Sequence, residues 1–153
     1  MQDRSNLTVL LVHEDGEQAR AVQQAARTLQ YMKEMLLVQG VQELTAYLDR
    51  CHPPFTGDAQ PCPNLILFDL QASLAGARDV LARLKRDEVF KPIPVVVLAR
   101  NEVSSEYADT YDLGINAFVR RPDDPEELAR TLRIIENFWL GVATLPHAER
   151  RSF

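Results

Sequence analysis

Asp69 is the residue of this sequence best placed to do chemistry, because its carboxylate ends an otherwise apolar run. The four residues before it, Leu65 to Phe68, are all apolar, as a strand buried on both faces of a sheet requires. A charged side chain is costly inside such a core, so Asp69 is expected at the carboxyl end of the strand, facing a crevice. Ligands of open α/β sheets collect at that edge, which makes Asp69 the first candidate site residue.

Two further side chains are candidates for the same edge. Glu14 follows the first apolar run of the chain, and Arg121 follows the last short one. Mg²⁺ binds through one or two carboxylates while keeping several waters, so Glu14, Asp69 and the backbone carbonyl of Gln71 would together suit this ion. The Arg121 guanidinium would neutralise the anion that forms if Asp69 acquires a phosphoryl group.

The elements that must position these residues alternate between strands and helices. Five short apolar runs are expected to form strands, namely Thr8–Val12, Met35–Val38, Leu65–Phe68, Val95–Leu98 and Ala117–Val119. Apolar residues at helical spacing follow the first three, at Ala19, Val22, Ala26 and Leu29, at Val41, Leu44, Tyr47 and Leu48, and at Val80, Leu81 and Leu84. A weaker amphipathic helix is expected over residues 104–113, closed by Gly114.

This alternation predicts a doubly wound α/β fold, with a five-stranded parallel sheet and helices on both faces. In the flavodoxin-like strand order 2-1-3-4-5, the first and third strands are neighbours at the switch point of the sheet. Glu14 and Asp69 would therefore lie together at one edge. We expect one domain over residues 1–146, followed by a loose polar tail over residues 147–153.

The composition argues against several classes of function. The chain has 153 residues, is 46% hydrophobic and carries a net charge of -5. An acidic balance without a basic patch argues against nucleic-acid binding. The first residues lack the apolar core of a signal peptide, and no apolar run approaches the roughly 20 residues of a membrane span. A soluble cytoplasmic protein that does not bind membranes is expected.

Residues 51–63 are rich in proline and are expected to form a surface loop. The simplest interpretation is a tolerated insertion, and the alternative is a partner-binding loop. Cys51 and Cys62 flank this loop without metal-ligand spacing. A disulfide between them is conceivable, but in a cytosolic chain such a pair is expected to stay reduced.

The last helix has the clearest pattern in the chain. Asp124 can cap it, with Pro125 at its first position and Glu127 completing a capping box. The core-facing stripe repeats at spacings of four and three, and comprises Leu128, Leu132, Ile135, Trp139 and Val142. Ile134 and Phe138 lie off that stripe and give the helix a second apolar face. Such a face indicates a partner surface, or else burial under neighbouring elements.

Several segments resemble the receiver domains of two-component response regulators, and the resemblance covers essentially the whole chain. The matching segments are Lys91–Leu98, Tyr111–Asn116, Arg121–Pro122 and Ile135–Leu140, with Leu145–Pro146 beyond. The Phe-Trp-Leu helix end is similar to that of small regulators partnered with phytochrome-type histidine kinases. The resemblance implies that Asp69 takes a phosphoryl group from a sensor histidine kinase, such as a bacteriophytochrome, with Mg²⁺ assistance. It also implies a homodimer, with Ile134, Phe138 and Trp139 at its interface.

The sequence departs from the family pattern at three places. The acidic pair that follows the first strand corresponds either to His13 and Glu14 or, with a one-residue offset, to Glu14 and Asp15. Ala99 stands where the family carries a Thr or Ser whose hydroxyl binds the phosphoryl group. Arg121 takes the place of the active-site Lys, which keeps the charge but changes the geometry. The switch aromatic is retained as Phe118.

Two functions therefore stand as hypotheses. The first is a phosphorylatable response regulator, which Asp69 with Glu14 opposite favours. The second is a pseudo-receiver that keeps the fold and the dimer surface but signals without phosphorylation, which His13, Ala99 and Arg121 together favour. An enzymatic function is not expected, because the sequence has no glycine-rich loop, no nucleophile elbow and no paired Cys and His.

Overall fold

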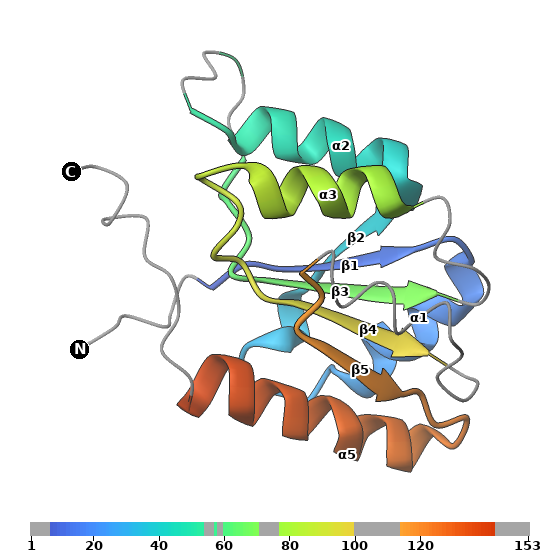
Figure 1. Cartoon of the computed structure of the whole chain (residues 1–153). Coiled ribbons are helices and arrows are strands. Elements are labelled where there is room, and N and C mark those ends of the chain that lie inside the picture. The colour runs from blue at the N-terminus through green and yellow to red at the C-terminus, as the bar shows by residue number, and fades with distance from the viewer. Residues whose placement is uncertain (1–6, 54–56, 58–59, 71–76, 100–113, 143–153) are drawn as a thin grey trace.

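The computed structural model describes residues 7–53, 57, 60–70, 77–99 and 114–142, and they form a parallel sheet with helices on both faces (Figure 1). The strands are β1 (Val9–His13), β2 (Leu36–Gln39), β3 (Leu65–Leu70), β4 (Val95–Ala99) and β5 (Ala117–Arg120). Their order in the sheet is β2-β1-β3-β4-β5, and every pairing is parallel. The predicted fold class and strand order are therefore confirmed.

The helices divide between the two faces of this sheet. They are α1 (Gly16–Ala25), α2 (Gly40–Cys51), α3 (Arg78–Arg86) and α5 (Pro125–Glu136), with a 3₁₀ turn at Met32–Glu34 and a π-helical end at Asn137–Val142. Figure 1 shows α2 and α3 above the sheet, and α1 and α5 below it. The helix expected over residues 104–113, and the domain boundary expected at residue 146, lie outside the described residues.

Two separate hydrophobic clusters fill the space between the helices and the sheet. Alternate residues of each central strand supply both clusters, because successive side chains of a strand point to opposite faces. Val12 and Phe68 pack with α2 and α3, whereas Leu11 and Leu67 pack with α1 and α5. The continuous apolar runs of β1, β3 and β4 follow directly from this burial on both faces.

Local signals set the starts of two helices, and one of them, the Asp124 cap, is predicted from the sequence. The Asp15 side chain caps α1 by accepting hydrogen bonds from the backbone N–H groups of Glu17 and Gln18. The Asp124 side chain caps α5 by accepting from the Glu127 N–H, with Pro125 at the first position. Both helices begin at the carboxyl edge of the sheet, because each follows a strand that ends there.

Gly114 has the left-handed backbone conformation that a helix end or turn requires, with φ of 94°. A Cβ at this position would lie 2.5 Å from Cδ of the exposed Lys85 side chain of α3, which would have to move aside. The proline-rich segment begins later than expected, because Cys51 is the buried last residue of α2. Cys51 and Cys62 do not form a disulfide.

Within the described ranges, no helix combines the length and apolar character that crossing a bilayer requires.

Candidate functional site

Asp69 lies near the carboxyl end of β3, and its side chain belongs to the sheet face that α1 and α5 cover. Leu65 and Leu67 pack into the cluster on that face, and side chains two residues apart on a strand share a face. Only 1% of the Asp69 surface is exposed. A carboxylate buried this deeply requires a compensating charge or hydrogen bonds.

Arg121 supplies the compensating charge. Its Nε lies 2.8 Å from Asp69 Oδ1, and both side chains are almost fully buried. The Nε–H makes no hydrogen bond within the described part of the chain, so proximity of opposite charges rather than a directed hydrogen bond holds this pair. Arg121 Nη2 also donates to the Gln18 carbonyl of α1 at 3.1 Å. The guanidinium therefore links the candidate site to the first helix.

The sheet itself positions Arg121. Its backbone N–H donates to the Ala99 carbonyl at 2.8 Å, which continues the pairing of β4 and β5 by one residue. Val119, two residues earlier, packs on the α1 and α5 face, so the Arg121 side chain emerges on the same face as Asp69. The predicted counter-charge is thus placed by strand register, and the structure brings these two residues together.

His13 occupies the strand position beside Asp69. The two residues are paired in the parallel register of β1 and β3, so their side chains lie on the same sheet face. His13 is 7% exposed, and its Nδ1 has no hydrogen-bond partner among the described residues. The residue that breaks the acidic pattern is therefore a buried neighbour of the candidate site.

Glu14 and Asp15 follow β1 and are both exposed. Asp15 is engaged as the cap of α1. Gln71 lies outside the described residues. Within the described part of the chain, no group of three or more His, Cys, Asp and Glu side chains is arranged to hold a metal ion.

Ala99 and Phe118 belong to the opposite face of the sheet. Ala99 is buried in the cluster under α2 and α3, together with Val95 and Val97. Phe118 is partly buried and packs against the same cluster. The Ala99 methyl group has no hydrogen-bond donor, so this strand end contributes only backbone to the site.

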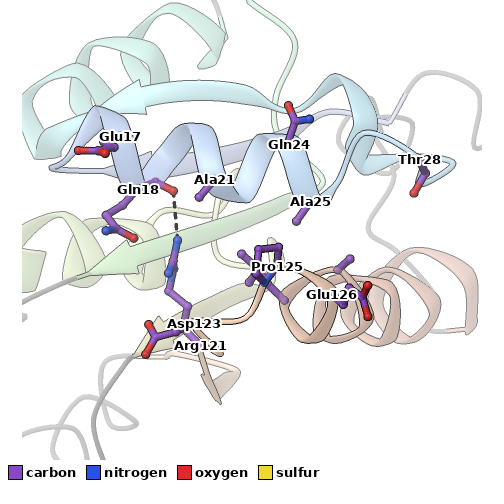
Figure 2. A pocket seen from close by; sticks show the side chains of 12 residues that line it. Glu17, Gln18, Ala21, Gln24, Ala25, Thr28, Arg121, Asp123, Pro125 and Glu126 are labelled. Carbon is purple, nitrogen blue, oxygen red and sulfur yellow. Dashed lines mark hydrogen bonds between the residues drawn. The ribbon is translucent and has the colours of Figure 1, made fainter.

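A groove of about 610 Å³ lies between α1 and the start of α5, next to the buried ion pair (Figure 2). Its lining comprises Glu17, Gln18, Ala21, Gln24, Ala25, Thr28, Arg121, Asp123, Pro125, Glu126, Leu128 and Ala129. Figure 2 shows Arg121 reaching across to α1, with Pro125 and Glu126 on the α5 side. Sequence reasoning did not predict this groove, because it depends on the spacing between two helices far apart in the chain.

Comparison with known proteins places this arrangement in a family. The chain is 32% identical to the response regulator Rcp1 of Synechocystis sp. over 152 residues, which span 97% of this chain and 100% of Rcp1. The chain belongs to the response regulator family. The family resemblance read from the sequence is therefore confirmed, although no protein-family model matches the chain.

Solved structures of other response regulators share the fold. The phosphorylated cyanobacterial phytochrome response regulator RcpA is 32% identical, with a TM-score of 0.76 over 92% of this chain and 99% of RcpA. The Mn²⁺-bound form of Rcp1 is 30% identical, with a TM-score of 0.73 over 92% of this chain and 99% of that chain. This response regulator is thus similar to proteins whose structures include a phosphorylated state and a metal-bound state.

The second apolar face predicted for the last helix of this response regulator is exposed. Ile134 is 63% exposed and Phe138 is 52% exposed, whereas Trp139 is partly buried against the cluster under α5. Phe138 and Trp139 pack edge to face, with ring centroids 4.8 Å apart. Burial under neighbouring elements, the alternative interpretation of this face, does not apply to Ile134 and Phe138 in the isolated chain.

Sequence reasoning missed Glu136, a buried carboxylate at the end of α5. Its side chain accepts hydrogen bonds from the backbone N–H groups of Gln30, Tyr31 and Met32, at 2.8 to 3.2 Å. A usable signal existed, because Glu136 follows Leu132 by four residues and so lies beside the core-facing stripe. The three backbone N–H groups that donate to Glu136 lie about a hundred residues away in the chain, and no sequence pattern identifies them.

Proposed function

We propose that Asp69 is the phosphoacceptor of this response regulator and takes a phosphoryl group from a histidine of a sensor kinase. The observation that carries the proposal is the buried Asp69 carboxylate at a strand end, with the Arg121 Nε 2.8 Å away. The carboxylate can act as a nucleophile, and the guanidinium is a fixed charge where negative charge develops. The chain would then catalyse nothing beyond its own phosphorylation.

The transfer forms one bond and breaks one. An Asp69 carboxylate oxygen attacks the phosphorus of the phosphohistidine, the P–N bond breaks, and the histidine nitrogen recovers a proton from solvent. The product is an acyl phosphate, which adds negative charge next to Arg121. Because Arg121 also holds the Gln18 carbonyl, we propose that this added charge is felt at the start of α1.

The carboxylates at this edge fit a hard divalent cation such as Mg²⁺. Asp69 and Glu14 lie at or just beyond the ends of the neighbouring strands β3 and β1, and Mg²⁺ needs only one or two carboxylates with water as further ligands. We propose Glu14, Asp69 and the Gln71 carbonyl as the protein ligands, with His13 or Asp15 as the candidates for one further ligand. When bound, the ion would offset charge on the transferring phosphoryl group. The Mn²⁺-bound form of Rcp1 supports this proposal.

A second candidate function is a pseudo-receiver that signals without phosphorylation. Ala99 favours it, because no hydroxyl at that strand end can bind a phosphoryl group and link it to Phe118. The buried His13 beside Asp69 favours it as well. In this alternative the protein acts as a dimeric interaction module in a fixed state.

We propose a phytochrome-type histidine kinase in the cytoplasm as the partner. Support comes from RcpA, described as a phytochrome response regulator, and from the response regulator RPA3017 in red light signalling of R. palustris, which shares the fold. The net charge of -5 favours protein partners over nucleic acid. The proposal predicts faster phosphotransfer from such a kinase than from unrelated sensor kinases in a side-by-side assay.

We further propose that the exposed face formed by Ile134, Phe138 and Trp139 is a homodimer interface. Two large side chains that are more than half exposed on one helix form a patch that a second copy of the chain would cover. A purely monomeric mass by light scattering at high micromolar concentration would contradict this assignment.

Phosphorylation is tested by incubating the protein with Mg²⁺ and acetyl phosphate, followed by intact mass spectrometry. We expect a mass gain of one phosphoryl group, which Asp69→Asn abolishes. Absence of any gain, both here and with a phosphorylated kinase, would favour the pseudo-receiver. Binding of beryllofluoride, followed by ¹⁹F NMR, provides a readout that does not depend on the lifetime of the acyl phosphate.

The ligand role of Glu14 is tested with a matched pair of variants. Glu14→Gln should weaken Mn²⁺ binding about tenfold or more, because it removes one of the two carboxylates. Asp15→Asn keeps the cap of α1 and should change Mn²⁺ binding much less. Comparable weakening by both substitutions, measured by Mn²⁺ electron paramagnetic resonance titration, would instead make Glu14 and Asp15 the acidic pair.

A further inference from the structure

Hydrogen bonds tie together the two ends of the proline-rich segment. Three hydrogen bonds join them, from Gln60 N–H to the Arg50 carbonyl at 3.0 Å, from the Tyr47 hydroxyl to the Pro61 carbonyl at 2.7 Å, and from Cys62 Sγ to the Cys51 carbonyl at 3.1 Å. Closing a loop costs conformational entropy, and these hydrogen bonds already hold the two loop ends together in the reduced protein. The end of α2 and the chain that follows the loop are therefore held next to each other.

This closure places the two cysteines of the chain next to each other. Cys62 Sγ contacts the backbone of Cys51, and Cys51 Sγ lies 3.4 Å from the Leu48 carbonyl one helical turn back. Both are thiols in this structure. A disulfide requires Cα atoms about 4.4 to 6.8 Å apart, and Cys62 Sγ already lies 3.1 Å from the backbone carbonyl of Cys51.

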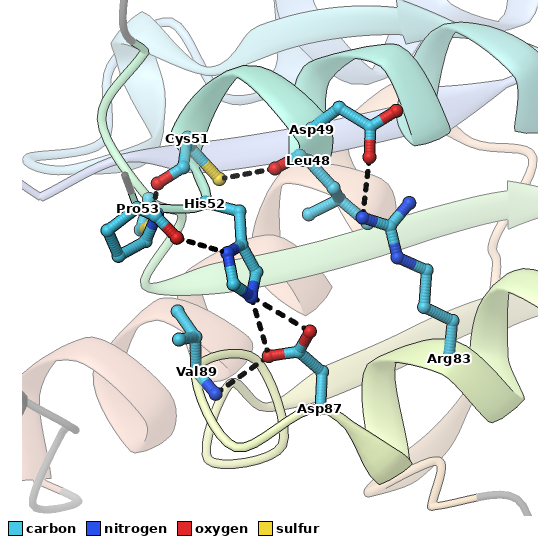
Figure 3. A network of polar contacts seen from close by, with 9 residues as sticks. Leu48, Asp49, Cys51, His52, Pro53, Arg83, Asp87 and Val89 are labelled. Atoms are coloured by element: carbon cyan, nitrogen blue, oxygen red, sulfur yellow. Dashed lines mark hydrogen bonds and ion pairs between the residues drawn. The ribbon is translucent and has the colours of Figure 1, made fainter. Parts of the chain in front are cut away.

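Side chains next to the thiols are engaged in hydrogen bonds of their own. Figure 3 shows His52, which follows Cys51, held between the Pro53 carbonyl and the Asp87 carboxylate. Burial, together with the nearby thiols of Cys51 and Cys62, raises the pKa of Tyr47 to about 12. The Tyr47 hydroxyl therefore stays neutral at physiological pH and adds no charge that would oppose a neighbouring thiolate.

We propose that Cys51 and Cys62 form a dithiol site that small-molecule disulfides of the glutathione class oxidise to an intramolecular disulfide. Cys62 is partly exposed and Cys51 is buried, so the oxidant reaches Cys62 first. The Cys62 thiolate attacks the oxidant disulfide, forming a mixed disulfide and releasing one small thiol. Cys51 then displaces the second small thiol. Two protein thiols are oxidised, and one small disulfide is reduced to two thiols.

The test is to equilibrate the full chain in glutathione buffers of graded ratio, quench it by alkylation, and measure its intact mass. We expect the reduced protein to take two alkyl groups, and the oxidised protein to take none and to lose the mass of two hydrogens. The folded chain should be half oxidised at a glutathione disulfide level about tenfold lower than the same chain in urea, because the fold holds the loop ends together. Equal midpoints for the folded and unfolded chain would overturn the proposal.

Two variants separate this site from general thiol reactivity. Cys51→Ser should accumulate a stable mixed disulfide on Cys62, because no second thiol displaces the glutathione. Cys62→Ser should react more slowly than Cys51→Ser, because Cys51 is buried. Disulfide-linked dimers of the unmodified chain, or a lasting mixed disulfide at Cys62 with Cys51 still alkylated, would each contradict the proposal. None of these outcomes depends on phosphorylation of Asp69.

Discussion

At the scale of single residues, the substitution of Arg for Lys gives this site its particular geometry. A Lys ammonium is a compact point charge, whereas a guanidinium presents donors in several directions. Arg121 places Nε 2.8 Å from Asp69 Oδ1 as an ion pair, and donates from Nη2 to the Gln18 carbonyl. A single buried side chain thus balances the Asp69 charge and contacts the backbone of α1.

The buried pair makes Arg121 important for stability as well as for the proposed chemistry. Arg121→Ala would leave the Asp69 charge buried without its partner, and should lower the free energy of unfolding by about 3 to 5 kcal/mol. Arg120→Ala, at the exposed neighbouring position, should change it by less than about 0.5 kcal/mol. Urea denaturation measures both. In an Asp69→Asn background the cost of Arg121→Ala should shrink markedly, and an unchanged cost would show that the ion pair is not its origin.

Ala99 offers a direct test of whether the missing hydroxyl limits switching. Ala99→Thr adds a donor at the end of β4, and a hydrogen bond to a charged acceptor contributes about 1.5 to 3 kcal/mol. We therefore expect beryllofluoride to bind about tenfold or more tightly to the Thr variant. Ala99→Val matches the shape of Thr without its hydroxyl and serves as the control. Similar affinities for the Thr and Val variants, by ¹⁹F NMR titration, would contradict this role.

At the scale of elements, α5 is fixed at both ends by side chains that serve backbone N–H groups. Asp124 caps its beginning, and Glu136 near its end bonds three N–H groups of the connection between α1 and β2. A carboxylate with several N–H donors forms strong, charge-assisted hydrogen bonds. The contact ties the end of α5, next to Phe138 and Trp139, to the connection between α1 and β2.

Glu136 should therefore be one of the most sensitive polar residues outside the site. Glu136→Gln replaces one carboxylate oxygen by an amide NH₂ group that cannot accept, and should cost about 2 to 3 kcal/mol of unfolding free energy. Glu126→Gln, on the exposed first turn of the same helix, should cost about 0.5 kcal/mol. Thermal and urea denaturation of the two variants give the comparison. Equal effects would mean that the buried contact contributes no more to stability than an exposed carboxylate on the same helix.

The sequence predicts those features of the fold that depend on neighbouring residues. Asp15 and Asp124 signal their helices within four positions, and the apolar runs of β3 and β4 show burial on both faces. The meeting of Asp69 and Arg121 was also predictable, because parallel strands of known order end at one edge. The Arg121 contact to Gln18 was not, since any residue carries a carbonyl. The partners of Glu136 could not be predicted either, since they are backbone N–H groups, which nearly every residue carries.

At the scale of the whole molecule, α5 lies between two surfaces of different character. On one side its first turns form the groove with α1, next to Arg121, and on the other side Ile134 and Phe138 are exposed. A change at Asp69 is therefore close to the groove, and movement of α5 would carry it to the exposed face. The two hypotheses for function differ in whether that movement occurs.

Self-association through the exposed face of α5 distinguishes them. Phe138→Lys or Ile134→Lys should weaken dimerisation about tenfold or more, because a large apolar side chain at an interface is replaced by a charge that must be desolvated. Gln42→Lys makes the same charge change on an exposed position of α2, across the sheet, and should leave dimerisation unchanged. Analytical ultracentrifugation gives the dissociation constants, and equal values for all three variants would remove the face from the interface. A dimer that tightens when beryllofluoride binds would identify a phosphorylation-driven regulator. A dimer of the same affinity with and without beryllofluoride would identify a pseudo-receiver, since a ligand with equal affinity for both states shifts no equilibrium.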